Sequence, residues 1–204
     1  MGLAATHPRY SIAEYLQRER ESLDKHEYRD GEILLMSGGS VNHSLIVANA
    51  SRSIGNRLEG KPCRVYDSNL RVRIPRTVLY TYPDATVICG KPEFDPNDSA
   101  GETVTNAKLI VEVLSPSTEG YDRGEKFHRY LQLDSLHEYV LVSQVAPRIE
   151  VFYRQAGGGW LFSPYSGVEQ VASLRSLQIE LPLREVFAGV EFPPELPPEA
   201  VNAR

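Results

Sequence analysis

Hydrophobic residues recur along the chain at two different spacings, which predict an alternation of helices and strands. Helical spacing with the capping pair Ser11 and Glu14 predicts a first helix over about 11–23. The apolar positions between 41 and 58 predict a second helix that ends near Gly60. A third helix is expected after the turn "SPSTEGYD", where Asp122 is positioned to cap it with Glu125 three residues on.

The remaining apolar segments are short, rich in β-branched and aromatic residues, and bounded by turn residues, as is typical of strands. Turns are expected at Asp30-Gly31 and at Gly157–Gly159. The order of elements predicts an α/β (α+β) fold in which a mixed central β-sheet is flanked by helices. We expect one domain over residues 1–204, with a proline-rich extended tail over about 191–204. The predicted strands are 32–36, "CRVYDSNLRVRI", "TYPDATVICG", "LIVEVL", "HEYVLVSQ", "RIEVFYRQ" and "WLFSPY".

One charge interrupts the most apolar of these strands. Glu112 lies within "LIVEVLSPST", where an unpaired carboxylate would cost several kcal/mol. The strand therefore requires a cation, a metal ion or a route to water beside Glu112.

Two other residues are candidates to meet Glu112. Asp84 follows Pro83 at the head of "PDATVI", so two adjacent strands could aim a carboxylate at one point. Converging carboxylates repel unless they share a proton or a cation, and their oxygen ligands suit Mg²⁺ or Mn²⁺. Lys126, one turn into the following helix, could pair with them, hold a water or stabilise charge on a phosphate. The alternative is purely structural: Asp84 caps a turn, and Glu112 forms a salt bridge with Lys126 or with an arginine.

Net charge and cysteine content limit the classes of protein to which this sequence can belong. A formal net charge of −5 argues against a protein that coats nucleic acid through a basic surface. It leaves room for a local basic cleft, for which Arg71, Arg73 and Arg123 are candidate phosphate contacts, although surface salt bridges explain them equally well. Cys63 and Cys89 lack zinc-site spacing and are expected to be reduced thiols. No secretory or membrane-spanning pattern is present, so a soluble cytoplasmic protein without a membrane partner is expected.

Five separated motifs resemble those of a known family. "DGEILLMSGGSVNHS", "YPDATVIC", "LIVEVLSPST", "YDRGEKFHRYLQL" and "HEYVLV" occur in an order similar to that of the bacterial "putative restriction endonuclease" family of the PD-(D/E)XK nuclease superfamily. The resemblance covers about 10–187. It implies a restriction-endonuclease-like core and metal-dependent cleavage of DNA at a site built from a P-D and an E-x-K motif.

The match to these motifs has one departure. Pro83-Asp84 matches the first motif and Glu112 the second carboxylate, but Leu114 stands where the motif has lysine. The resemblance implies that Lys126, on the following helix, replaces that lysine.

Three further residues are second-tier candidates. Tyr130 lies one helical turn beyond Lys126 and could support it by a hydrogen bond, or it could be an ordinary core aromatic. Glu27 and His43 fall on motif positions of the family, and His43 could equally be a capping or packing residue.

These observations lead to three hypotheses. The first is a Mg²⁺-dependent DNA endonuclease in which Asp84 and Glu112 bind the metal and Lys126 assists attack by water. The second is a noncatalytic module that retains the nuclease fold and binds nucleic acid or protein, a reading favoured by Leu114. The third is hydrolysis of another phosphodiester. A homodimer is consistent with the first hypothesis by analogy, because cutting both strands of a duplex takes two sites.

Overall fold

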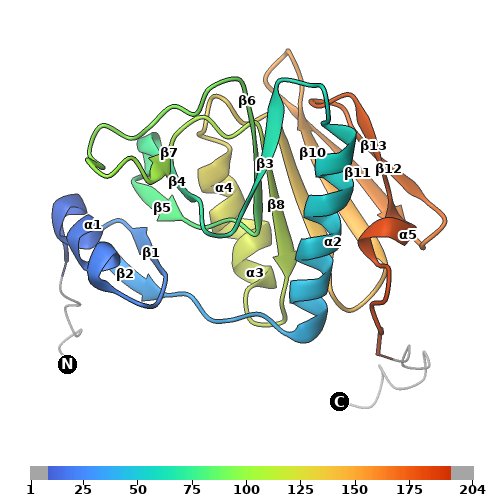
Figure 1. Ribbon diagram of the computed structural model, residues 1–204, viewed down its shortest axis with the longest axis horizontal. Coiled ribbons are helices and arrows are strands. Elements are labelled where there is room, and N and C mark those ends of the chain that lie inside the picture. Colours follow the sequence, from blue (N-terminus) through green and yellow to red (C-terminus); the bar gives the residue numbers. More distant parts are fainter. Residues whose placement is uncertain (1–8, 194–204) are drawn as a thin grey trace, which may run out of the picture.

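The computed structural model is described here over residues 9–193, and it consists of three β-sheets with helices packed against them (Figure 1). The helices are α1 (Ile12–Glu21), α2 (Val41–Arg57), η1 (Pro75–Thr77), α3 (Glu119–Tyr121), η2 (Asp122–Lys126), α4 (Phe127–Tyr130) and α5 (Leu183–Val186). The strands are β1 (His26–Arg29), β2 (Glu32–Leu35), β3 (Cys63–Asp67), β4 (Arg71–Ile74), β5 (Leu79–Thr81), β6 (Ala85–Cys89), β7 (Thr103–Val104), β8 (Leu109–Leu114), β9 (Glu138–Ser143), β10 (Arg148–Arg154), β11 (Trp160–Ser166), β12 (Val171–Leu174) and β13 (Ile179–Pro182).

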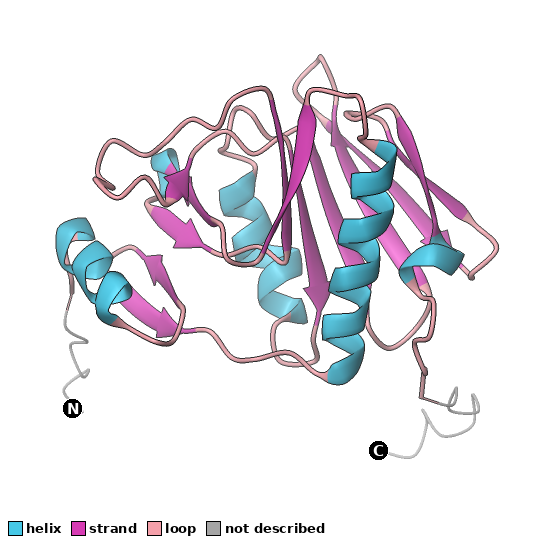
Figure 2. Cartoon of the chain, in the orientation of Figure 1, coloured by secondary structure: helices cyan, strands magenta, loops and turns pink. Residues whose placement is uncertain are grey.

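The largest sheet has six strands in the order β11-β10-β9-β8-β6-β3. Its β8–β9 pair is parallel and its other pairs are antiparallel, so the sheet is mixed. A second sheet has the order β2-β1-β5-β4-β7, and β12 and β13 form a separate hairpin. The colouring by secondary structure shows the helices lying against these sheets (Figure 2). The prediction of a mixed sheet flanked by helices is confirmed.

Strand β8 is buried along its whole length because both faces of the large sheet are covered. Leu109, Val111 and Val113 belong to the core on the side of α2 and α5. Ile110 and Leu114 belong to the core on the opposite side, with Tyr130 of α4. Figure 1 shows α2 in front of the sheet and α3 and α4 behind it. Side chains alternate along a strand, so Glu112 shares the face of Ile110 and Leu114.

The N-terminal elements follow local signals in the sequence. The side chain of Ser11 accepts a hydrogen bond from Glu14 N, and the Glu14 carboxylate accepts one from Ser11 N, which is the predicted capping box. Asp30 and Gly31 both have positive φ and form the two-residue turn between β1 and β2. The hairpin is held by stacking of Tyr15 of α1 on Tyr28 of β1, with ring centroids 5.0 Å apart.

The helical segment after β8 begins earlier than predicted. It starts at Glu119, and Asp122 lies inside it, so the prediction that Asp122 caps the helix is wrong. The Asp122 N–H is already donated to the Thr118 carbonyl, 2.9 Å away, and the Asp122 side chain is buried. Residues 122–126 form a π-helical turn, a wider turn that often occurs at functional sites.

The cysteine prediction is also wrong, because Cys63 and Cys89 form a disulfide. These residues are directly paired across β3 and β6, a proximity that their separation of 26 residues in the sequence does not reveal. No helix among residues 9–193 is long and apolar enough to cross a bilayer. Most of the expected proline-rich tail lies outside the described residues.

Candidate active site

The two carboxylates predicted to converge do lie side by side, Asp84 directly before β6 and Glu112 within the neighbouring β8. The antiparallel register pairs Ala85 of β6 with Val111 of β8, which places Asp84 beside Glu112. The backbone N–H of Val113 donates a hydrogen bond to Asp84 Oδ2 at 2.7 Å. Pairing of β6 with β8 therefore fixes Asp84 close to the strand that carries Glu112.

Glu112 has two partners from the helical segment that covers its face of the sheet. Its Oε1 lies 2.7 Å from Lys126 Nζ and accepts a hydrogen bond from the Tyr130 hydroxyl at 2.8 Å. Glu112 is 4% exposed and Lys126 5%. The buried carboxylate thus has its cation, and Tyr130 contacts the carboxylate of Glu112.

Lys126 also lies beside a second carboxylate that the sequence analysis did not select. Its Nζ is 3.4 Å from Asp122 Oδ1, and both residues belong to the π-helical turn. The signal available in the sequence was the i,i+4 spacing of an acid before a lysine. Within residues 9–193 the ion pairs of Lys126 are with Glu112 and Asp122, whereas Asp84 pairs with His43.

The electrostatic balance of this cluster favours a charged lysine. Burial alone would lower the pKa of Lys126, but Glu112, Asp122 and Glu27 outweigh it and raise the pKa above its usual value. Burial raises the pKa of Glu112 to about 8; Asp84 and Asp122 act in the same direction, and the Lys126 ammonium opposes them. Lys126 is therefore a fixed cation at neutral pH, beside a carboxyl group that a further positive charge would help to ionise.

His43 approaches Asp84 from the first turn of α2. Its Nε2 lies 3.3 Å from Asp84 Oδ2, and the hydrogen bond between them raises the His43 pKa. Ser40 caps the helix through the His43 N–H at 3.1 Å. A Cβ at Gly39 would lie 2.4 Å from His43 Nδ1, so the glycine leaves room for the imidazole.

Glu27 lies on β1 beside the same cavity. Its two oxygens accept hydrogen bonds from the hydroxyl groups of Tyr121 and Thr81, the latter at 2.9 Å. Glu27 is therefore already engaged by protein donors, although its charge acts on Lys126.

The ionisable residues of this cluster line one cavity of about 270 Å³. It lies between the β1–β2 hairpin, the start of α2, the end of β8 and the helical segment that follows β8. Its lining includes Glu27, Arg29, Met36, Gly39, His43, Tyr82, Asp84, Glu112, Val113, Ser115, Thr118, Tyr121, Asp122 and Lys126.

The three arginines considered for phosphate contacts are not part of this cavity lining. Arg71 is 2% exposed and pairs with Asp98 at 2.8 Å. Arg73 pairs with Asp95, and Arg123 pairs with Glu119 and Glu150. Their guanidinium groups are already engaged by protein carboxylates, so the structure does not bring them to the site.

The donor set fits a hard divalent cation only in part. Asp84 Oδ1 and Glu112 Oε2 accept no hydrogen bond from any of the described residues. Within residues 9–193, no group of three or more His, Cys, Asp or Glu side chains is placed to hold a metal. Two free carboxylate oxygens suit Mg²⁺, which keeps several waters and takes one or two carboxylates together with substrate phosphate.

The half-buried Asp84 and the buried Glu112 and Lys126 thus lie together beside the mixed sheet of an α+β fold. Residues 12–184 match the Uma2 family, described as "Putative restriction endonuclease", and the chain belongs to this family.

Two related proteins are similar to this chain in sequence, and one solved structure is similar to it in fold. The chain is 38% identical to "Uncharacterized protein slr1290" of Synechocystis sp. over 190 residues, 93% of this chain and 97% of the relative. It is 35% identical to "Uncharacterized protein sll1609" of the same organism over 167 residues, 82% of this chain and 93% of the relative. The fold is similar to a "putative nuclease belonging to DUF820" from Anabaena variabilis, with a TM-score of 0.67, 15% identity, and 85% and 97% of the two chains covered.

Proposed function

We propose that this protein is a divalent-metal-dependent endonuclease that hydrolyses phosphodiester bonds of DNA. The observation that carries the proposal is the convergence of Asp84, Glu112 and Lys126 at one cavity, with Lys126 Nζ 2.7 Å from Glu112. Membership of the Uma2 family supports the same class of reaction.

Asp84 and Glu112 would hold Mg²⁺ or Mn²⁺ through their free oxygens. The ion would supply an activated water and polarise the phosphoryl group. The Val113 N–H and His43 orient Asp84, and Tyr130 orients Glu112. Lys126 contributes a fixed positive charge that stabilises negative charge on the phosphate or positions the water. The set needs no covalent nucleophile.

The test incubates purified protein and supercoiled plasmid with Mg²⁺ or Mn²⁺, beside Asp84→Ala and Glu112→Ala. We expect nicking by the parent protein and a loss of about 10²-fold or more in either variant. Calorimetric titration with Mn²⁺ gives a readout independent of activity, since either substitution should abolish binding. Nicking that survives both changes would exclude this site.

The noncatalytic alternative is tested by the same preparations. It predicts binding of DNA or a protein without plasmid nicking by the parent protein under either metal. The observation in its favour is Leu114, which is buried in the core in place of the motif lysine.

A further inference from the structure

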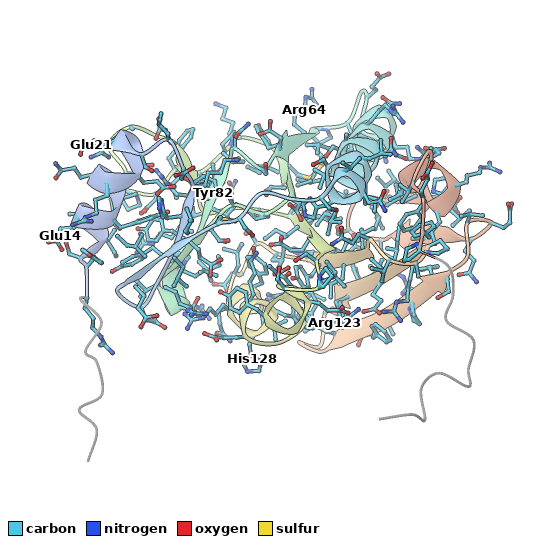
Figure 3. All side chains as sticks on the ribbon, turned by 90° about the horizontal axis from the view of Figure 1, so that it is seen from below. Glu14, Glu21, Arg64, Tyr82, Arg123 and His128 are labelled. Carbon is cyan, nitrogen blue, oxygen red and sulfur yellow. A yellow bond between two sulfur atoms is a disulfide. The ribbon has the colours of Figure 1, made fainter. Side chains whose placement is uncertain are left out.

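The helical segment that follows β8 is held from two sides. It spans residues 119–130 and comprises α3, η2 and α4. Figure 3 shows this segment end-on, between the blue N-terminal hairpin and the orange strands of the large sheet. On the side of the sheet, Arg123 pairs with Glu150 of β10, and the Tyr139 hydroxyl of β9 donates to the Asp122 carbonyl at 3.1 Å.

Ion pairs at the surface join the other side of the segment to the β1–β2 hairpin. Arg129 lies 2.6 Å from Asp30, and Arg29 lies 3.5 Å from Glu125. The side chains of the two acids are 58% and 51% exposed. Ion pairs with so much solvent around them contribute little to holding two elements together.

A buried hydrogen bond joins the same two elements. The hydroxyl of Tyr121, the last residue of α3, donates to Oε1 of Glu27 on β1. Pairing of β1 with β5 matches Tyr28 with Tyr80, so Thr81 lies opposite Glu27 and donates to its other oxygen at 2.9 Å. Glu27 is 6% exposed, and a hydrogen bond to a buried carboxylate is stronger than one between neutral groups. Loss of the Tyr121 hydroxyl would leave one of these buried oxygens without its donor.

Tyr121 directly precedes the π-helical turn that carries Lys126. The ammonium at the far end of this turn lies 2.7 Å from Glu112. Because a helical turn moves as a hydrogen-bonded unit, a shift at Tyr121 would displace the ammonium from Glu112. The charge of Glu27 acts on the same group: burial lowers the pKa of Lys126, and Glu27 helps Glu112 and Asp122 to raise it.

We infer that Tyr121 is a positioning residue, whose hydrogen bond to Glu27 fixes the start of the π-helical turn against β1 and so holds the ammonium of Lys126 at Glu112. The inference rests on the proposed function, in which Lys126 acts on the phosphate or on the water. Tyr121 acts through Lys126, and the N-terminal hairpin thereby becomes part of the structure that sets the rate of cleavage.

Tyr121→Phe tests the inference because it removes only the hydroxyl group. Steady-state kinetics on a labelled oligonucleotide in Mn²⁺ should show kcat lower by about tenfold with KM unchanged. The matched control is Tyr28→Phe, at the neighbour of Glu27 on β1, whose hydroxyl donates to the Tyr10 carbonyl at 2.7 Å outside the cavity. This control should keep the parent kcat. A parent kcat in Tyr121→Phe, or equal losses in the two variants, would overturn the inference.

Substitutions at Glu27 show whether the hydrogen bond or the charge is responsible. Glu27→Gln keeps an oxygen that accepts from Tyr121, so its kcat should stay close to that of the parent. Glu27→Leu removes the acceptor and should lose as much as Tyr121→Phe. The double variant Tyr121→Phe/Glu27→Leu should be no slower than either single variant, because both substitutions remove the same interaction. Losses that multiply in the double variant, or a Glu27→Gln protein as slow as Glu27→Leu, would contradict the inference.

Hydrogen exchange separates this inference from the proposed function, because it needs no activity. The backbone amides of residues 119–130 should exchange about tenfold faster in Tyr121→Phe than in the parent, and at the parent rate in Tyr28→Phe. If the parent cleaves no substrate, faster exchange in Tyr121→Phe would show that the nuclease proposal is wrong although Tyr121 holds the segment. Unchanged exchange would show that the hydrogen bond does not hold the segment, whether or not DNA is cleaved.

Discussion

The Lys126 ammonium reaches Glu112 from the helix that covers β8, and Leu114 occupies the strand position two residues beyond Glu112. Leu114 and Glu112 share one face of the strand, so a lysine at 114 would project toward the same side. Lys126 enters from above that face, between Glu112 and Asp122. The positive charge is thus supplied by the π-helical turn instead of the strand.

Replacing Lys126 with alanine should abolish most of the nicking activity. The variant removes the fixed cation of the site, and loss of one preorganised electrostatic group typically lowers the rate by about 10²–10³-fold. Plasmid nicking in Mn²⁺ measures the effect. The matched control is Lys91→Ala, an exposed lysine outside the cavity, which should retain the parent rate.

Lys126→Ala also leaves Glu112 buried without its cation, so folding must be checked by circular dichroism. Lys126→Arg provides the second variant, because it keeps the charge in a larger planar group that fits the same space poorly. A folded Lys126→Ala protein that nicks plasmid at the parent rate would show that Lys126 has no role in the reaction.

Asp122→Asn should slow the reaction without weakening substrate binding. Asp122 Oδ1 lies 3.4 Å from Lys126 Nζ and helps to hold the ammonium, so the neutral amide should let Lys126 shift. We expect kcat to fall about tenfold with KM unchanged, the pattern of an interaction that acts in the transition state. Steady-state kinetics on a labelled oligonucleotide measure both constants. Asp134→Asn, at an exposed acid, is the control; an effect on KM alone in Asp122→Asn would contradict a positioning role.

Much of the candidate site could be predicted because its signals are local in the sequence. A carboxylate inside the apolar run "LIVEVL" requires a partner wherever the strand lies, and Pro83-Asp84 marks the head of another apolar segment. Alternation along the strand then places Glu112 on a known face. The capping box of α1 and the Asp30-Gly31 turn likewise depend on residues a few positions apart.

The features that sequence reasoning missed depend on contacts between distant residues. The disulfide depends on the register of β3 with β6, which no local pattern specifies. Arg71 and Arg73 lie on one strand face with the spacing of a phosphate-binding pair, yet Asp98 and Asp95 from a distant loop neutralise them. The π-helical turn over residues 122–126 could not be predicted, because no local pattern in the sequence distinguishes it from an ordinary α-helical turn.

Moving the lysine back to the strand should restore part of the activity. Leu114→Lys alone places a second ammonium in a buried site beside Lys126, which should lower the free energy of unfolding by several kcal/mol. In the double variant Leu114→Lys/Lys126→Ala the new lysine faces Glu112 without this competitor. We expect it to nick plasmid about tenfold or more faster than Lys126→Ala alone.

Leu114→Met/Lys126→Ala is the matched control, since methionine fills the same space without charge. The two double variants are compared by plasmid nicking, with urea unfolding to show that both are folded. If both are equally inactive and folded, the strand position cannot supply the cation, and the geometry of the π-helical turn is required.

Low pH should destabilise the fold partly by breaking the contacts that join Glu185 of α5 to Ser53 and Arg57 of α2. Hydrogen bonds from Arg57 and Ser53 lower the pKa of Glu185 from 4.5 to about 2. A carboxyl group with a depressed folded-state pKa contributes stability that is complete above pH 4.5 and is lost as the pH falls toward 2. Glu185→Gln should therefore lower the free energy of unfolding at pH 7, and the difference from the parent should vanish as the pH approaches 2.

The Glu185 side chain is 40% exposed, so screening keeps the loss at pH 7 below about 1 kcal/mol. Urea unfolding at a series of pH values measures the difference, with Glu180→Gln, an exposed acid on β13, as the control. A difference that is constant across the pH series would show that Glu185 stabilises the fold through packing and not through its charge.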